Sequence, residues 1–317
     1  MGRTVTLTSR ADEFIQGSAA RNIEIRLFTL GGNDQVLLNR VDDLGGGNVV
    51  DTGSGRDIVE NRKESGNVIT LGTGNDTYIG RGFGSFATDP FDEVFGGKGD
   101  DLIAVETFKS RYFGGADDDS FFSVGWQNTF NGGSGTDSIS YAPRDTDSTQ
   151  GGSAVTINLA QGFAQTGASR RETLISIENA TGSGAGDLII GNGKANRLEG
   201  AGGADELEGG GGADRFVFAK ASHSRVVDGN FDLIIDFSRS ERDRIDLGPM
   251  DANSRISGNQ SFTFIGTADF SGRAGQLRVE RDDGGIFVFG DLDGNREADF
   301  VIGLQGVSAL SAADFIL

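Results

Sequence analysis

Apolar residues recur at a fixed distance from certain polar residues along most of this chain. We call these polar residues, mostly Asp or Asn at the end of a turn, the anchors. The anchors stand nine residues apart between 187 and 214, while Asp101, Asp119 and Asp137 stand 18 apart. Two positions after an anchor the residue is apolar at sixteen places, although hydrophobic residues make up only 36% of the sequence. These residues are Phe14, Val36, Val50, Val59, Ile69, Tyr78, Val94, Ile103, Tyr112, Phe121, Phe130, Ile139, Ile189, Leu198, Leu207 and Phe216. The pattern indicates a nine-residue repeat that fails at Asn22, which Glu24 follows two positions later.

A nine-residue unit suits a Gly-rich turn followed by a short strand. In a strand, successive side chains point to opposite faces, so Leu207 would point inward while Glu206 and Glu208 point outward. Two units complete a coil of 18 residues and place every second turn on the same edge. The prediction is an all-β protein, a right-handed parallel β-roll of nonapeptide repeats with a thin core between two sheets.

The repeat ends near residue 218, which predicts two domains. We expect the β-roll over residues 1–218, interrupted by a spacer near 141–180. A small C-terminal β domain is expected over residues 219–317.

Charge and composition narrow the classes of partner. The chain of 317 residues has 47 acidic and 28 basic residues, a net charge of −19. This balance argues against nucleic acid or an anionic membrane as the partner and suits a cation. With no Cys, neither disulfides nor thiolate metal sites can stabilise the fold. Residues 1–20 lack the pattern of a signal peptide, and no apolar run is long enough to span a membrane.

Stacked carboxylates create a repulsion that a cation would remove. Neighbouring strands lie about 4.8 Å apart, so Asp101, Asp119 and Asp137 would repel one another if nothing neutralised them. Calcium binds oxygen ligands, and Gly lets the turn backbone bend so that carbonyl groups also face an ion. We therefore predict several calcium ions, between Asp57 and Asp76 and between successive members of the trio. The competing interpretation is a row of solvated turns in which Asp only favours the turn.

The two edges of the predicted roll differ in charge. The opposite edge of the earlier rungs carries neutral anchors, which can stack through amide hydrogen bonds without an ion; they include Asn48, Asn67, Ser110 and Asn128. In the C-terminal block, Asp187 is expected to pair with Asp205, and Asn196 with Asp214. The predicted metal-binding residues are Asp34, Asp57, Asp76, Gly96, Gly97, Gly99, Asp101, Gly114, Gly115, Asp119, Gly132, Gly133, Gly135, Asp137, Asp187, Asn196, Gly200, Asp205, Gly209, Gly210, Asp214, Asp291, Asp293 and Asp299.

Three stretches carry a family resemblance. "GGKGDDLIA" (96–104), "GGSGTDSIS" (132–140) and "GGGGADRFV" (209–217) match a glycine-rich nonapeptide pattern. In these the chain resembles the RTX (repeat-in-toxin) family of calcium-binding proteins. Asp117 replaces a Gly of the pattern, Leu71 replaces another, and "TLGGNDQVL" lacks the first two. Residues 154–187 are similar to the spacer that often precedes the last repeats in this family.

The remainder resembles the C-terminal domain of serralysin-type metalloproteases. The matching segments include "FDLIIDFSRSERDRIDL", "FVFGDLDGNREADFVIGL" and the terminal "LSAADFIL". The resemblance implies export by a type I secretion apparatus, from a Gram-negative bacterium into the extracellular medium. In that family the uncleaved signal lies at the extreme C-terminus, which Asp314 to Leu317 would fit. As a bare pattern, these four residues are equally suited to a last strand tucked into a core.

Catalysis is not expected. A zinc protease motif needs two histidines, and this chain has only His223. It has neither a G-x-S-x-G motif nor a cysteine nucleophile. We expect a calcium-binding secreted protein that folds on extracellular calcium. The alternatives are an adhesin or carbohydrate-binding protein using residues 80–97 and 120–130, with Trp126 as a sugar platform, or a polysaccharide-acting enzyme that uses carboxylates.

One further loop has two interpretations. In "DLDGNREAD", Asp291, Asp293 and Asp299 have a spacing that suits one more calcium ion. Arg296 stands where an EF-type loop requires Gly. A plain acidic hairpin turn remains the alternative.

Overall fold

The computed structural model describes residues 3–17, 24–39, 46–62, 65–81, 91–147, 152–226 and 230–317. The chain divides into two compact units. The first unit comprises Met1–Pro143 and Gly162–Ile177, and the second comprises Arg144–Gln161 and Glu178–Leu317. The helices of the described residues are short 3-10 turns, η2 (Ala142–Thr146), η3 (Ala221–His223) and η4 (Ala312–Asp314). No helix in these ranges has the length and apolar character needed to cross a membrane.

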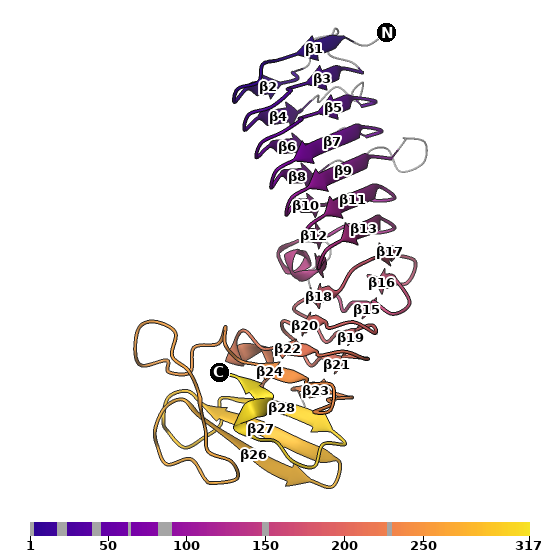
Figure 1. Ribbon diagram of the computed structural model, residues 1–317. Coiled ribbons are helices and arrows are strands. Elements are labelled where there is room, and N and C mark those ends of the chain that lie inside the picture. Colours follow the sequence, from indigo (N-terminus) through magenta and orange to yellow (C-terminus); the bar gives the residue numbers. More distant parts are fainter. Residues whose placement is uncertain are drawn as a thin grey trace. The chain divides into compact units, whose positions relative to one another are not determined.

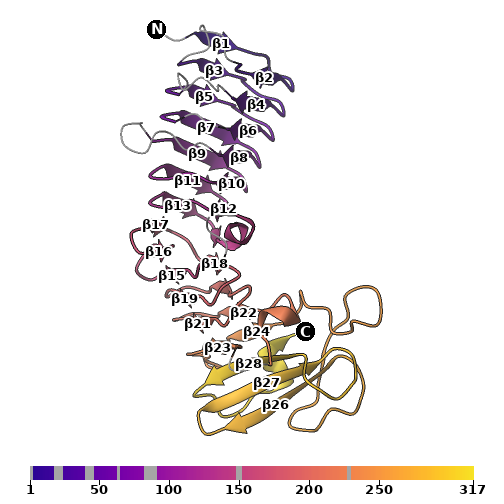
Figure 2. The same ribbon diagram turned by 180° about the vertical axis from the view of Figure 1, so that it is seen from behind.

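The first unit is a parallel β-solenoid with two sheets (Figures 1 and 2). Strands of one sheet pair in the order β1 (Thr4–Thr6), β3 (Arg26–Phe28), β5 (Val49–Asp51), β7 (Val68–Thr73), β9 (Glu93–Lys98), β11 (Arg111–Ala116), β13 (Thr129–Ser134) and β17 (Arg171–Ile175). The other sheet runs β2 (Glu13–Ile15), β4 (Gln35–Leu38), β6 (Ile58–Asn61), β8 (Thr77–Gly80), β10 (Leu102–Val105), β12 (Ser120–Ser123) and β14 (Ser138–Ser140). All of these pairs are parallel. In the described part of this unit the one antiparallel pair is formed by β16 (Phe163–Gln165) with β17. The predicted all-β, β-roll class of fold is confirmed.

The nine-residue pattern explains the register and the core. Ile103 pairs with Phe121 and Phe121 with Ile139, so residues 18 apart are direct neighbours. Fifteen of the sixteen apolar positions have at most 2% of their surface exposed. Phe14, in the first rung, is half-buried. Each rung covers the next, which is why a thin core suffices.

The second unit continues the same architecture and adds an antiparallel sheet. One parallel series is β15 (Thr156–Asn158), β19 (Leu188–Ile190), β21 (Glu206–Glu208), β23 (Asp232–Ile234) and β28 (Phe300–Gln305). The other is β18 (Asn179–Thr181), β20 (Arg197–Glu199), β22 (Arg215–Val217), β24 (Arg244–Asp246) and β29 (Phe315–Ile316). β26 (Gln276–Asp282) and β27 (Gly285–Asp291) form a hairpin that pairs with β28, while β25 (Thr263–Phe264) pairs with β26. Parallel pairing therefore runs past residue 218, where the nine-residue period ends; the boundary between 218 and 219 remains a prediction.

Candidate metal centre

Six aspartates form a buried carboxylate ladder on one edge of the first unit. They are Asp34, Asp57, Asp76, Asp101, Asp119 and Asp137, and their exposed fractions lie between 0 and 2%. Each of the first five donates its backbone N–H to Oδ1 of the next, at 2.7 to 2.9 Å. Each Asp stands at the turn that leads into one of the strands β4 to β14 of the second sheet. The ladder therefore places a carboxylate at the start of each of these strands, although only Asp101, Asp119 and Asp137 stand 18 residues apart.

The second carboxylate oxygen is left without a donor. Within the described residues, Oδ2 of Asp34, Asp57, Asp76, Asp101 and Asp119 is buried and makes no hydrogen bond. A buried polar group without a partner is unfavourable by about 1–3 kcal/mol, and more when charged. A row of such oxygens requires protons or a cation.

These oxygens lie where the Cβ atom of any residue other than glycine would be. A Cβ built on Gly96 would lie 2.3 Å from Asp101 Oδ2, and one on Gly114 would lie 2.0 Å from Asp119 Oδ2. Neither of these glycines has a left-handed backbone, whereas the glycine that follows Gly114, Gly115, has φ +124°. The first Gly of each turn is thus required for close approach and the second for conformation. Backbone bending, the role expected from the sequence for these glycines, therefore applies to the second Gly and not to the first.

The other predicted glycines follow the same division. Those that face a carboxylate oxygen within 2.4 Å are Gly132, Gly200 and Gly209, whose built Cβ atoms approach Asp137, Asp205 and Asp214. Those with a left-handed backbone are Gly97, Gly99, Gly133, Gly135 and Gly210. Each of the predicted glycines therefore meets one of these two requirements of the turns, close approach to a carboxylate oxygen or a left-handed backbone.

Burial raises the proton affinity of the ladder. It raises the pKa of Asp76 to about 6 and that of Asp101 and Asp119 to about 7, and neighbouring carboxylates add to the effect. The backbone hydrogen bonds to Oδ1 act in the opposite direction. The charged ladder is therefore unfavourable unless a positive group lies beside it.

On the opposite edge of the first unit, anchors of neighbouring rungs form a ladder of hydrogen bonds with one another, which we call the amide ladder. Asn48 donates its backbone N and Nδ2 to Oδ1 of Asn67, and Asn67 donates the same two groups to Asp92 Oδ1 at 2.9 Å. Asp92 donates its backbone N–H to Ser110 Oγ, and Ser110 donates its own to Asn128 Oδ1. These anchors therefore pair with one another within the protein.

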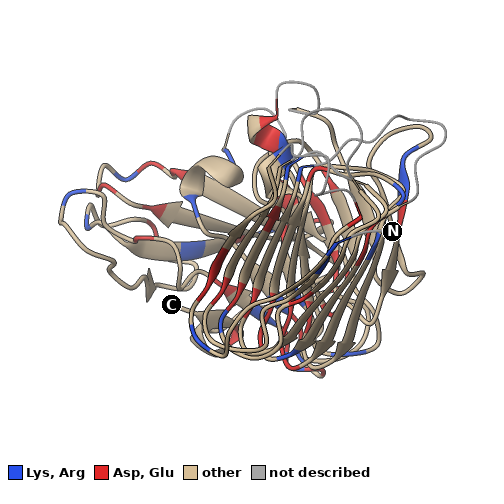
Figure 3. Ribbon diagram, turned by 90° about the horizontal axis from the view of Figure 1, so that it is seen from above, with Lys and Arg blue, Asp and Glu red and all other residues tan. Residues whose placement is uncertain are grey.

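Carboxylate ladders occur on both edges of the second unit. Asp187 donates its backbone N–H to Asp205 Oδ1, and Asp205 donates to Asp232 Oδ1 at 3.0 Å. On the other edge, Asn196 donates to Asp214, and Asp214 to Asp243. Acidic residues, red in Figure 3, recur from one turn to the next.

Unpaired oxygens occur on both of these edges as well. Oδ2 of Asp205 and of Asp214 is buried without a hydrogen-bond partner among the described residues. Asp187 differs, because both of its oxygens accept hydrogen bonds, from Ser183 and Val155. Burial raises the pKa of Asp214 to about 7, and burial together with Asp232 raises that of Asp205.

Sequence reasoning missed Asp232 and Asp243. They lie 27 and 29 residues after their partners, not at the 18-residue spacing that the repeat sets for stacked turns. The signal was present nevertheless: Ile234 and Ile245 stand two positions after them and are fully buried. Asp236 was also missed, and it accepts hydrogen bonds from the backbone of the predicted turn at residues 209–210.

The family comparison covers the second half of the chain. Residues 166–317 match the model of the peptidase M10 serralysin C-terminal domain. We refer to residues 166–317 below as the serralysin C-terminal domain, after this match. The match includes no part of a catalytic protease domain. A separate comparison with curated proteins gave no match. The serralysin C-terminal match and the β-solenoid are together consistent with an RTX-type protein.

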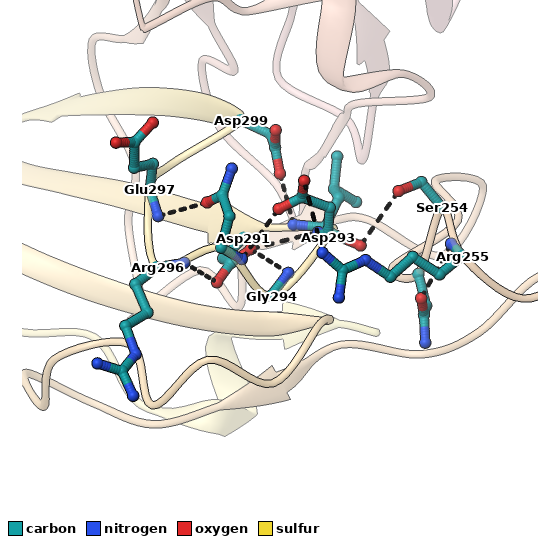
Figure 4. Close-up of polar contacts among 11 residues, drawn as sticks. Ser254, Arg255, Asp291, Asp293, Gly294, Arg296, Glu297 and Asp299 are labelled. Atoms are coloured by element: carbon teal, nitrogen blue, oxygen red, sulfur yellow. Dashed lines mark hydrogen bonds and ion pairs between the residues drawn. The ribbon is translucent and has the colours of Figure 1, made fainter.

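One acidic cluster of the serralysin C-terminal domain lies in the loop after β27 (Figure 4). Ligand atoms of Asp291, Asp293 and Asp299 lie within 4.8 Å of one another, the one such cluster among the described residues. Asp291 Oδ1 already accepts hydrogen bonds from the backbone of Asp293 and Gly294, and Oδ2 accepts from Arg296. Backbone N–H groups of the loop thus already bind the Asp291 carboxylate. A calcium site and a plain acidic hairpin turn both remain predictions for this loop.

The end of the serralysin C-terminal domain is a strand. Asp314 is buried; its Oδ2 accepts hydrogen bonds from Ser311, and its Oδ1 accepts one from Arg239 Nε at 2.9 Å. Phe315 pairs with Ile245 in the parallel series. The segment is therefore tucked into the fold, as the alternative interpretation had it.

The sites proposed for a sugar or an enzyme gain little support. Trp126 stacks on Phe108 with centroids 5.9 Å apart, and the Arg170 guanidinium lies 4.5 Å from its ring centre. These contacts engage the ring faces that a sugar would use. Residues 82–90 of the predicted protrusion lie outside the described residues.

Proposed function

We propose that this chain is a calcium-binding secreted protein of the RTX type, whose β-roll folds when its buried carboxylates bind extracellular calcium. The observation that carries the proposal is the row of buried Oδ2 atoms without a donor. Carboxylate oxygens are the ligands that Ca²⁺ prefers, and backbone carbonyls of Gly-rich turns supply more. The residues that would hold the ions are the ladder aspartates with the glycines of their turns, and in the second unit Asn196 joins them.

Calcium concentration would then act as the folding switch. Extracellular calcium modules bind at about 10⁻⁴ to 10⁻³ M, far above cytosolic free calcium. Inside the cell the carboxylates stay without a cation and their mutual repulsion opposes folding. Outside, a site at ten times its dissociation constant adds about 1.4 kcal/mol, so several sites together reach the stability of a typical domain.

Export through a type I secretion apparatus fits the serralysin C-terminal match. The segment Asp314–Leu317 would be read before the chain folds, because Asp314 and Phe315 are buried in the folded state. We propose no catalysis by this chain, because it has one histidine and no cysteine to serve as a general base or nucleophile.

Circular dichroism during a calcium titration from EDTA tests the proposal. We expect a cooperative gain of β-structure near millimolar calcium, and none with magnesium at the same concentration. Replacing Asp101 and Asp119 by Asn should shift the midpoint to higher calcium. The Asp51→Asn variant, which removes a half-exposed carboxylate from the outer face of β5, should not shift it. A chain already folded in EDTA would show that the ladders need no ion.

A further inference from the structure

Three arginines stand in direct register on one outer face of the second unit. Arg197 pairs with Arg215, and Arg215 with Arg244, as the first residues of β20, β22 and β24. The next residue of each strand points into the core: Leu198, Phe216 and Ile245 are fully buried. The arginines therefore share the outer face and follow one another at the strand spacing of about 4.8 Å. We call them the arginine row.

Like charges directly opposite one another on a sheet are destabilising. The chain has only 28 basic residues against 47 acidic ones, so a line of three is a marked departure from its overall charge. Like the stacked aspartates, these arginines carry equal charges at a close spacing, and here the charges are positive. A row of cations at this spacing needs a row of anions beside it.

The protein supplies only part of that neutralisation. Arg197 Nη2 lies 3.3 Å from Glu199 Oε2. The Nη1 group of Arg244 donates to the backbone oxygens of Arg242 and Asp243, which fix the guanidinium without cancelling its charge. Arg215 is exposed, and its side chain makes no hydrogen bond or ion pair with the described residues. The guanidinium N–H groups of Arg215, in the middle of the row, are thus available to bind a ligand.

We propose that the arginine row binds a linear acidic polysaccharide along the direction in which the rungs stack. A guanidinium donates two parallel hydrogen bonds to a carboxylate, and uronic acid chains repeat a carboxylate along their length. The site requires the folded roll, but its binding groups are side chains to which the calcium proposal gives no role, and it involves no catalysis.

Two other polyanions fit the face less well. Single-stranded nucleic acid is bound by aromatic side chains on which bases stack. The outward residues of these strands include no aromatic side chain; they are Arg197, Glu199, Arg215, Val217, Arg244 and Asp246. A membrane surface is bound by apolar residues that insert beside the basic ones. At the outward positions of these strands the one apolar residue is Val217, and it is buried and cannot insert.

Binding of short oligogalacturonates to the full chain, at fixed calcium and low salt, tests the proposal by calorimetry. Arg215→Gln should weaken binding about tenfold, and replacing all three arginines by Gln about a hundredfold or more. Arg215→Lys should recover only part of the affinity, because the ammonium lacks the planar fork. Added salt should weaken wild-type binding more steeply than that of the triple variant.

Arg26→Gln is the matched control, because Arg26 is also an exposed first residue of a three-residue strand, β3 in the first unit. It should leave the affinity unchanged, and circular dichroism in calcium should confirm that every variant folds. An equal loss in Arg26→Gln would assign binding to overall charge and overturn the proposal. Absence of wild-type binding, equal binding of neutral dextran, or a preference for anionic vesicles would overturn it too.

Discussion

Replacing Asp92 by Asn tests the electrostatics of the amide ladder. Asp92 is buried; its Oδ1 accepts two hydrogen bonds from Asn67, and its Oδ2 accepts one from Asn61 at 3.1 Å. Burial raises the pKa of Asp92 to about 7, although hydrogen bonds from Asn67, Tyr78 and Asn61 lower it. Asn would retain the shape and the Oδ1 acceptor, and it would match the anchors Asn48 and Asn67 of neighbouring rungs.

The magnitude follows from the shift in pKa. The folded value lies about 3 units above the ordinary 3.8, and one unit corresponds to 1.36 kcal/mol. Because the folded state holds the proton more tightly, stability falls as pH rises from about 3.8 to about 7. The unfavourable contribution is about 1.6 kcal/mol at pH 5 and about 4 kcal/mol at pH 8. Asp92→Asn should therefore increase stability by about 2.5 kcal/mol more at pH 8 than at pH 5.

Urea unfolding of both chains at the two pH values, in the same saturating calcium, measures this difference. Other titrating groups and the calcium sites enter both chains alike, so they cancel in the comparison. Asp51→Asn serves as control and should change stability by less than about 0.5 kcal/mol at either pH. An Asp92→Asn effect that is equal at pH 5 and pH 8 would refute the reasoning, since only the buried charge depends on pH.

Three further changes test the turns and the core. Gly114→Ala should destabilise the calcium-loaded protein by more than about 2 kcal/mol, because its Cβ would overlap Asp119 Oδ2, while Gly193→Ala, with no atom within 4 Å, should be tolerated in urea unfolding. Asp119→Asn should reduce the number of bound calcium ions measured by calorimetry. Leu207→Ala should lower stability by about 2–5 kcal/mol, whereas Leu30→Ala, at a side chain 54% exposed, should have little effect on the urea midpoint.

The sequence predicted the β-roll because its rule is local. A strand of three residues buries its middle side chain, so Leu207 and Phe121 could be placed inside from their distance to an anchor alone. The spacing of 18 then determined which strands pair, as in Ile103 with Phe121. Neither step needs knowledge of the rest of the chain.

The candidate site was less accessible to sequence reasoning. Asp232 and Asp243 join the ladders after connections whose length the repeat does not constrain. The distance between Gly114 and the Asp119 carboxylate depends on how closely the two ends of one turn approach each other. The amino-acid composition of the turn does not reveal that distance. That Asp187 is satisfied by Ser183 could not be anticipated either, since it depends on the path of one particular turn.

The anchor residue decides whether an edge needs an ion. An Asn anchor accepts the N–H of its neighbour and donates its own amide onward, so a ladder such as Asn48 to Asn67 is complete within the protein. An Asp anchor accepts the same N–H through Oδ1 but has nothing to donate. Its Oδ2 is left over unless another group donates to it, as Asn61 does to Asp92. In the first unit these leftover oxygens form a continuous row on one edge. In the second they occur on both edges, at Asp205 and at Asp214. Loss of calcium should therefore weaken one edge of the first unit and both edges of the second, a difference that hydrogen exchange of the turn amides would resolve.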